Sequence, residues 1–292
     1  MNAGFVPALG TPLDKDGNII ESSYKKQIEM LLEAGSVGVL AMGTMGQQAY
    51  IKTSETIKVA KITVDQVKGR IPIFVGAMDN SIHRTRERIA AMEDLDIAGF
   101  VFTTPYYHLC SFDHLVNYYK GIAAATKHSI FLYDLPGVTQ TKITFELVVK
   151  LIKEIPNLAG IKTADMQLLR KLKLSDETPD PFLMMFSSLD VFDIGYKWGL
   201  TNYLDGMVDC TPVNFSTMDK AFKGGNYEIA AKCLSNVVSL RDLLIAHDIL
   251  PAFSAAMNLL GCEGNYAFDY TSPVNEKSIE AIRAEMKRIG EL

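Results

Sequence analysis

Eight short apolar segments that alternate with longer amphipathic ones constrain the fold of this chain more than any other feature. Several are apolar on both faces, as in the run Ile71-Pro72-Ile73-Phe74-Val75, and this pattern is typical of parallel strands covered on both sides. The expected strands lie at residues 5–9, 37–42, 71–77, 99–103, 130–133, 159–162, 183–186 and 203–208. Eight strand–helix units before residue 226 match the length of a (β/α)₈ (TIM) barrel, which is the predicted fold.

Helix signals separate these strands. Ser22, Ser54, Ser111 and Thr144 each precede an apolar stripe with helical spacing, and Gly35 is expected to end the first helix. A doubly wound open sheet is the competing fold. It usually has fewer strands and a glycine-rich phosphate turn after the first one, whereas here residues 10–14 read Gly-Thr-Pro-Leu-Asp.

The pattern changes near residue 226. Residues 227–247, 250–260 and 275–292 read as three helices without intervening strands. We therefore expect a catalytic barrel at 1–225 and a C-terminal helical extension at 226–292. No low-complexity linker separates the two parts, which argues against an independent second domain.

Composition and charge exclude several classes of protein. With 48% hydrophobic and 22% charged residues, the chain has the balance of a globular protein with a real core. Its 29 basic and 34 acidic residues give a net charge of −5, which argues against nucleic acid or an anionic membrane as partner.

The charge-free run at 34–51 contains too much glycine and glutamine for a membrane span. No basic residue precedes Lys15, so the start lacks the pattern of a secretory signal. The four cysteines are far apart and form no zinc motif, which fits a reducing compartment. We expect a cytoplasmic protein.

Two side chains at predicted strand ends are candidates for catalysis. The active sites of (β/α)₈ barrels lie at the carboxyl ends of the strands, where Lys162 and Tyr133 stand in this sequence. Burial there favours a neutral lysine amine, the form that attacks carbonyl groups, and a phenol nearby can carry a proton. The alternatives are a solvated lysine in a turn and a tyrosine that only packs on its neighbours.

Other strand ends carry weaker signals. In the turn Gly43-Thr44-Met45-Gly46, glycines let the backbone approach a ligand and N–H groups can hold a carboxylate. Tyr106 and Tyr107 follow the fourth strand, where adjacent tyrosines most often serve packing or a subunit interface. The five histidines have no metal-ligand spacing, and the chain has no Gly-x-Ser-x-Gly motif.

Together these segments resemble the dihydrodipicolinate synthase/N-acetylneuraminate lyase family of Schiff-base (class I) aldolases. The resemblance runs along nearly the whole chain. Its strongest pieces, in family order at four strand ends, are Gly43-Thr44-x-Gly46, Thr104-Pro105-Tyr106-Tyr107, Tyr133-Asp134-Leu135-Pro136-Gly137 and Gly160-Ile161-Lys162.

The resemblance implies roles for particular residues. Lys162 would form an imine with pyruvate or another 2-oxo acid, and Tyr133 would be the general acid and base. Thr44 and Tyr107 would link Tyr133 to solvent, with Tyr107 reaching into a neighbouring subunit. Backbone groups of Thr44 and Met45 would hold the substrate carboxylate, and the carbonyl of Val208 would lie near the pyruvate.

The resemblance also implies a homotetramer built as a dimer of dimers, with neither a metal nor an organic cofactor. This agrees with the chemistry, because the iminium is itself the electron sink.

Departures from the family pattern bear on the substrate. Met45 and Gln47 replace a hydroxyl residue and a glutamate, so one carboxylate donor is lost. Val138 stands where the synthase branch has an arginine for a second carboxylate, and valine cannot bind one. Asp134 replaces the usual asparagine and would add a charge beside Tyr133.

The lyase branch is matched in part. Residues 141–144 and Asp190, at the position of a sugar-binding aspartate, resemble it, but Val191, Ala164 and Cys210 replace polar residues that sugar hydroxyls need.

We therefore expect a class I aldolase or lyase that acts on a 2-oxo acid, with an unassigned and less charged acceptor than that of the synthase. One alternative is a 4-hydroxy-tetrahydrodipicolinate synthase, or an N-acetylneuraminate or 2-keto-3-deoxy sugar acid lyase, with altered contacts. The other is a non-catalytic homologue that binds a ligand, which Met45 and Val138 favour and which Lys162 and Tyr133 oppose.

Overall fold

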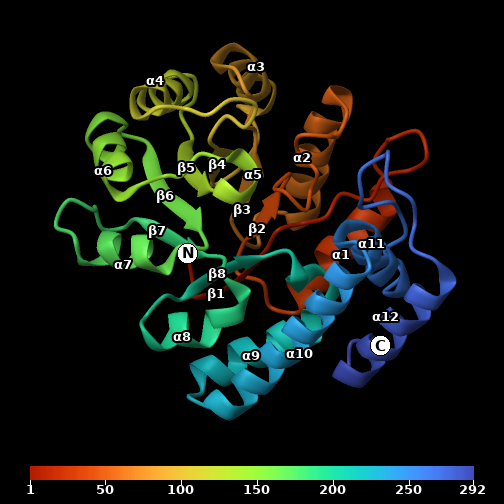
Figure 1. The fold of residues 1–292 in the computed structure, drawn as a ribbon. Coiled ribbons are helices and arrows are strands. Elements are labelled where there is room, and N and C mark those ends of the chain that lie inside the picture. The colour runs from red at the N-terminus through yellow and green to blue at the C-terminus, as the bar shows by residue number, and fades with distance from the viewer.

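The computed structural model describes residues 1–292, and eight parallel strands form a barrel surrounded by helices (Figure 1). Neighbouring strands follow the order β1-β8-β7-β6-β5-β4-β3-β2. A parallel bridge between Ala8 and Leu40 closes the barrel between β1 and β2. The strands are β1 (Gly4–Pro7), β2 (Val39–Ala41), β3 (Ile73–Gly76), β4 (Gly99–Thr103), β5 (Ser129–Asp134), β6 (Leu158–Thr163), β7 (Leu183–Phe186) and β8 (Asn202–Asp205).

The predicted (β/α)₈ barrel is confirmed, and one strand boundary needs correction. The sequence placed Val208 within the eighth strand, but β8 ends at Asp205 and Val208 lies in a 3₁₀ helix, η2 (Met207–Cys210). The Asp205 carboxylate accepts a hydrogen bond from the backbone N–H of Met207 at 2.8 Å. Such a local side-chain bond turns the chain away from the sheet.

Several barrel helices begin at a polar side chain that accepts a hydrogen bond from a free backbone N–H group. Ser111 and Thr144 cap α4 and α6 as predicted, but Ser22 and Ser54 lie one residue inside α1 and α2 and cap neither. These helices are α1 (Glu21–Glu33), α2 (Thr53–Val67), α3 (Ile82–Met92), α4 (Phe112–Ala123), α5 (Pro136–Thr139), α6 (Phe145–Glu154), α7 (Met166–Leu174), η1 (Leu189–Val191), α8 (Phe192–Lys197) and α9 (Pro212–Lys223).

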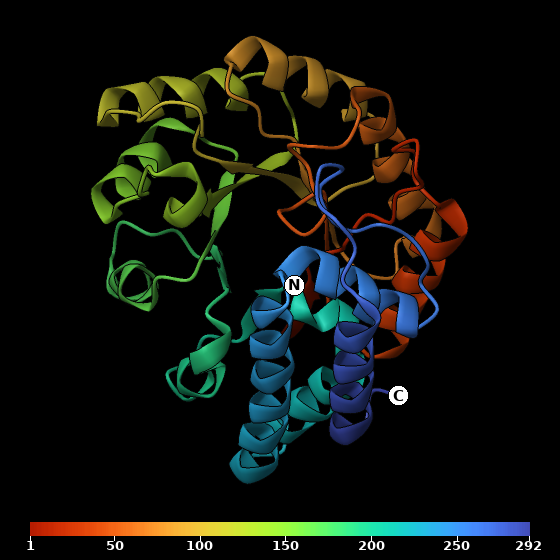
Figure 2. The ribbon, with the colours of Figure 1, turned by 45° about the vertical axis from the view of Figure 1, so that its right-hand side comes forward.

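Three further helices follow the barrel: α10 (Tyr227–Ala246), α11 (Ile249–Leu259) and α12 (Glu276–Ile289). Figure 2 shows α10 and α12 side by side below the barrel. The carboxylate of Glu291 accepts hydrogen bonds from the backbone N–H groups of Val213 and Asn214, at 3.0 and 2.9 Å, and so caps α9. The boundary between residues 225 and 226 stays a prediction.

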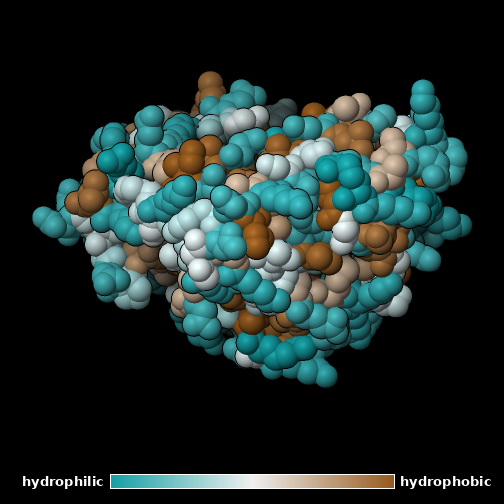
Figure 3. Space-filling model, turned by 90° about the horizontal axis from the view of Figure 1, so that it is seen from below, coloured by the Kyte–Doolittle hydropathy of each residue, from teal (hydrophilic) through white to brown (hydrophobic).

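One hydrophobic core runs from Phe5 in β1 to Met286 in α12 and joins the barrel to the extension. Among the helices, none has the length and apolar character needed to cross a membrane. The face shown in Figure 3 is largely hydrophilic, and its hydrophobic residues form small separate patches.

The β6–β7 contact leaves no room for a side chain at Gly160. A Cβ atom there would lie 2.2 Å from the carbonyl oxygen of Leu183. We predict that Gly160→Ala lowers the free energy of unfolding by about 1–3 kcal/mol, because the two strands must separate. Gly137→Ala is the control, since a Cβ atom there meets nothing within 4 Å. Equal denaturation midpoints for the two variants would contradict this account.

Candidate active site

Two buried side chains meet at the carboxyl ends of β5 and β6. Tyr133 and Lys162 are register partners in these adjacent strands, so their side chains leave the sheet on the same face. The Lys162 Nζ atom lies 4.0 Å from the centre of the Tyr133 ring. Lys162 is 5% exposed and Tyr133 is 4% exposed, so the structure brings the two predicted residues together in a site largely shielded from water.

Thr44 joins this pair from the loop after β2. Its Oγ1 lies 3.2 Å from the hydroxyl of Tyr133. The loop packs tightly at Gly46, where a Cβ atom would lie 2.8 Å from the backbone of Met42. Met42 and Gln47, on either side of this turn, have left-handed backbones with φ of 55°. Few non-glycine residues adopt this backbone conformation, and those that do are frequent at functional sites.

The backbone N–H groups of Thr44 and Met45 donate to no group within the chain. The Met45 side chain packs against Gly206, where a Cβ atom would lie 2.2 Å from its Cγ. Val208 is buried, and its carbonyl oxygen accepts a hydrogen bond from the backbone N–H of Thr211 at 3.3 Å. The predicted carboxylate donors, Thr44 and Met45, are therefore free to bind a ligand, whereas the Val208 carbonyl, predicted near the pyruvate, already accepts one hydrogen bond.

Asp134 braces the ends of the two strands that carry the pair. Its carboxylate accepts hydrogen bonds from the Thr163 hydroxyl at 2.7 Å and from the Ile143 backbone N–H at 3.0 Å. It also forms an ion pair with Lys142, whose Nζ lies 2.9 Å from Asp165. The charge expected beside Tyr133 is thus matched by a lysine, and this partner was missed because Lys142 lies in a separate loop.

A second group of charges lies on the β7–β8 side of the site. Burial raises the pKa of the Asp205 carboxyl above its ordinary value, while the charges of Lys162 and Arg241 oppose that effect. Arg241, from α10, binds both carboxylate oxygens of Asp190, at 2.6 and 2.8 Å, and lowers the pKa of Asp190.

Sequence analysis missed Asp205 because the predicted strand ran past it, and it missed Arg241 because α10 carries no motif. The alignment of Asp190 with a sugar-binding position gave no sign of its ion pair.

Tyr107 does not join the site within one chain. Its side chain is 80% exposed and lines a separate surface hollow with His108 and Leu109. The side-chain oxygen of Asn80 holds the loop, because it accepts hydrogen bonds from the backbone N–H groups of Tyr106 and Tyr107 at 2.8 and 2.9 Å. The loop therefore presents Tyr107 away from Lys162 of its own chain.

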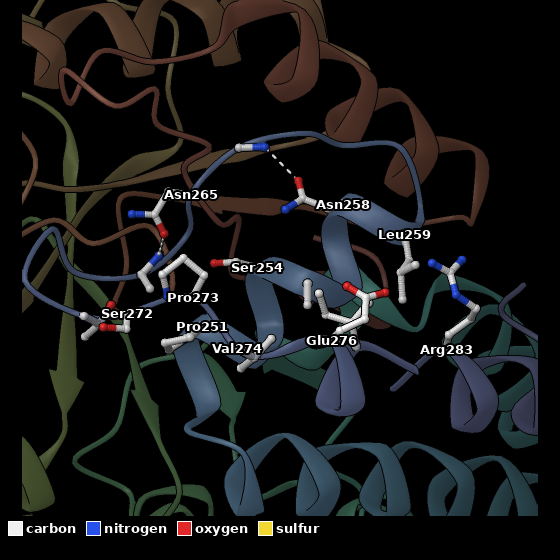
Figure 4. Close-up of a pocket in the computed structure, with 15 residues that line it drawn as sticks. Pro251, Ser254, Asn258, Leu259, Asn265, Ser272, Pro273, Val274, Glu276 and Arg283 are labelled. Carbon is white, nitrogen blue, oxygen red and sulfur yellow. Dashed lines mark hydrogen bonds between the residues drawn. The ribbon is translucent and has the colours of Figure 1, made fainter. Parts of the chain in front are cut away.

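A cavity of about 450 Å³ lies elsewhere, between α11, α12 and the loop that joins them (Figure 4). None of the predicted site residues lines it. Asn258 and Asn265 point their side-chain oxygens at the loop backbone, where they accept hydrogen bonds from Gly264 and Ala267 at 2.8 and 2.9 Å. These side chains shape the loop, and we place the candidate active site at the barrel mouth.

A buried lysine beside a phenol, at the strand ends of a (β/α)₈ barrel, can attack a carbonyl carbon and move the protons that this requires. This fold and this site define a lyase of the class I, Schiff-base-forming aldolases. Residues 1–289 match the Dihydrodipicolinate synthetase family. The chain belongs to that family, as the resemblance in the sequence predicted.

Relatives and solved structures match this chain over nearly its full length. The 4-hydroxy-tetrahydrodipicolinate synthase of Oleidesulfovibrio alaskensis is 30% identical, over 96% of this chain and 97% of the relative. That of Methanopyrus kandleri is 28% identical, over 98% and 96%. The dihydrodipicolinate synthase structure from Thermotoga maritima superposes with a TM-score of 0.90 at 25% identity, covering 100% of both chains. The Proteus mirabilis N-acetylneuraminate lyase structure shares the fold, with a TM-score of 0.90 at 22% identity over 100% and 99%.

The Asp134 brace gives a test of how the site is held. We predict that Asp134→Ala lowers the free energy of unfolding by about 1–3 kcal/mol, because the Ile143 N–H and the Thr163 hydroxyl lose their acceptor. Asp134→Asn keeps one acceptor oxygen and should fall between this variant and the parent. Chemical denaturation measures both effects. An alanine variant as stable as the parent would show that the brace is dispensable.

Proposed function

We propose that this enzyme makes or breaks a carbon–carbon bond next to a 2-oxo acid, with the substrate bound as an imine on Lys162. One observation carries the proposal: Lys162, Tyr133 and Thr44 form a continuous group, joined by the 4.0 Å amine–ring contact and the 3.2 Å hydrogen bond. A nucleophile and a proton carrier within reach of one carbonyl carbon are the minimum that this chemistry needs.

In the direction of bond formation, the Lys162 amine adds to the keto carbon of pyruvate, and loss of water leaves an iminium. Loss of a proton from the methyl carbon gives an enamine, whose carbon bonds to the aldehyde carbon of the acceptor. Tyr133 gives a proton to the aldehyde oxygen and recovers one through Thr44. Water then hydrolyses the iminium, which frees Lys162 and releases a 4-hydroxy-2-oxo acid.

The free N–H groups of Thr44 and Met45 support a carboxylate site in this loop. Two neighbouring N–H donors without partners bind an anion well. The Val208 carbonyl would lie at the pyruvate end, as its place in η2 after β8 allows.

The strict synthase and sialic acid lyase reactions have less support. Val138, 59% exposed in α5, offers no cation for a second carboxylate. Asp190 already binds Arg241 through both carboxylate oxygens, so a sugar hydroxyl would have to share that carboxylate with the arginine. Steady-state assays with pyruvate plus aspartate semialdehyde, and with sialic acid, separate these reactions from the proposed one.

The proposal includes a cytoplasmic homotetramer, built as a dimer of dimers. Tyr107 and Leu109, in the loop after β4, and Phe112, at the start of α4, expose large apolar side chains, and such patches mark protein contacts. Tyr107 of one subunit would reach the Thr44–Tyr133 pair of its neighbour. Four free cysteines support a reducing compartment.

Borohydride reduction in the presence of pyruvate, followed by peptide mass spectrometry, tests the imine directly. We predict a pyruvate adduct on Lys162 and no adduct or turnover in Lys162→Ala, with the fold retained. Lys171→Ala, an exposed lysine on α7, is the control and should be trapped like the parent. Tyr133→Phe should still be trapped, while turnover falls roughly 10²–10⁴-fold because the proton carrier is lost. A folded parent without an adduct would favour the ligand-binding homologue.

The role of Tyr107 can be separated into packing and proton transfer. We predict that Tyr107→Ala weakens assembly, measured by analytical ultracentrifugation, and also lowers turnover. Tyr107→Phe keeps the ring and should preserve assembly while turnover falls, because only the hydroxyl is lost. Full turnover of the phenylalanine variant would remove Tyr107 from the proton path.

A further inference from the structure

A cavity of about 220 Å³ opens beside Thr44 on the β2–β5 side of the mouth. It is smaller than the roughly 300–1,000 Å³ of sites for drug-sized ligands, so a small molecule would fill it. None of the thirteen residues that line it is charged. Its large side chains are Tyr50, Met78, Tyr106, Leu135, Val138 and Phe268.

The cavity adjoins the reacting end of the site. Thr44 lines it and hydrogen-bonds Tyr133. Thr103, another lining residue, is the register partner of Tyr133 in β4. Neither Tyr133 nor Lys162 lines the cavity, so a molecule in it would touch Thr44 and would have to extend past that hydroxyl to reach the proton carrier, as the second substrate of an aldol reaction must.

Aromatic rings form one wall. The rings of Tyr50 and Phe268 lie 4.1 Å apart between centroids. Phe268 comes from the loop between α11 and α12, which rises toward the β2 side of the barrel in Figure 2. Flat apolar surfaces of this kind favour an aromatic or similarly apolar ligand.

Two buried polar atoms of the lining have no partner. They are Nε2 of Gln47 and Oγ1 of Thr103, in side chains that are 1% and 3% exposed. The neighbouring Gln48 differs, since its Nε2 donates to the Met78 carbonyl at 2.6 Å. Buried polar groups are almost always hydrogen-bonded, and each exception calls for an explanation. A ligand oxygen that accepts from Gln47 would supply one, once the amide, which is now buried, turns toward the cavity.

We propose that this cavity receives the acceptor, and that the acceptor is an uncharged aldehyde with an apolar, ring-sized body bearing one oxygen that accepts a hydrogen bond. A carboxylate or ammonium group would lose part of its hydration there and would find no opposite charge in the lining. This inference rests on the proposed function, because the acceptor reacts with the enamine formed on Lys162.

The test compares aldehydes that share one ring. With pyruvate and the full-length protein, kcat/KM should be highest for 3-hydroxybenzaldehyde, lower for benzaldehyde, and at least about tenfold lower again for 3-carboxybenzaldehyde. Val138→Arg should raise kcat/KM for 3-carboxybenzaldehyde, relative to kcat/KM for benzaldehyde, by about tenfold or more. Ile194→Arg adds the same charge at an exposed apolar position on α8, outside the cavity, and should leave the ratio unchanged.

A second variant tests the unpartnered amide. Gln47→Leu keeps the approximate size of the side chain and removes the donor. The higher kcat/KM for 3-hydroxybenzaldehyde than for benzaldehyde should therefore disappear. A decrease that is equal for all three aldehydes would overturn the role of Gln47, because it would reflect a general loss of loop structure.

The outcomes distinguish this inference from the function on which it rests. If borohydride traps pyruvate on Lys162 but the carboxylated ring reacts as well as the plain one, or no aromatic aldehyde reacts, the acceptor inference is wrong and the imine chemistry stands. If pyruvate is not trapped, the proposed function itself fails. If Val138→Arg changes the assembly state and not the ratio, the cavity holds a second copy of the chain, and the inference is overturned.

Discussion

The pairing of β5 with β6 is the contact on which the site depends. Tyr133 lies opposite Lys162, and the next residues along the strands, Asp134 and Thr163, are also opposite each other. Because side chains alternate across a strand, the first pair shares one face of the sheet and the second pair shares the other. The 2.7 Å hydrogen bond from Thr163 to Asp134 therefore fixes the strand ends from outside the reacting space. A slip of one residue would place Tyr133 opposite Ile161 or Thr163 and leave no amine beside the phenol.

The mouth of the barrel has two chemically different sides. On the β7–β8 side, Arg241 forms an ion pair with Asp190, and the charges of Lys162 and Arg241 act on the buried Asp205 carboxyl. On the β2–β5 side, the cavity beside Thr44 is lined by uncharged residues only. Lys162 lies between them, so an imine formed there would have charge compensation on one side and an apolar space on the other. This asymmetry gives a bound substrate a preferred orientation.

The sequence was a good guide where a local pattern encodes a local structure. Both-face apolar runs predicted eight strands, and the ends of those runs located Tyr133 and Lys162. Features that depend on contacts between distant segments were not accessible. Arg241 reaches Asp190 across 51 positions, and only the folded extension brings them together. The end of β8 was placed too late because the residues from Met207 to Cys210 are as buried as a strand, although Asp205 turns the backbone into η2.

Two of the departures from the family pattern, Met45 and Gln47, lie in one loop, and this has a physical consequence. Lys162, Tyr133 and Thr44 are kept, whereas Met45 lies in the turn between the left-handed residues Met42 and Gln47, and Gln47 is the second replaced residue. With Met45 packed against Gly206, the loop offers a substrate carboxylate its backbone N–H groups but no second hydroxyl. Backbone donors are held by the turn itself, so replacing that side chain leaves the anion site weaker but in place. Gln47 instead faces the cavity, where an uncharged amide replaces a carboxylate. Under the proposed function, the chain thus keeps the groups for imine chemistry and changes residues beside the space proposed for the second substrate.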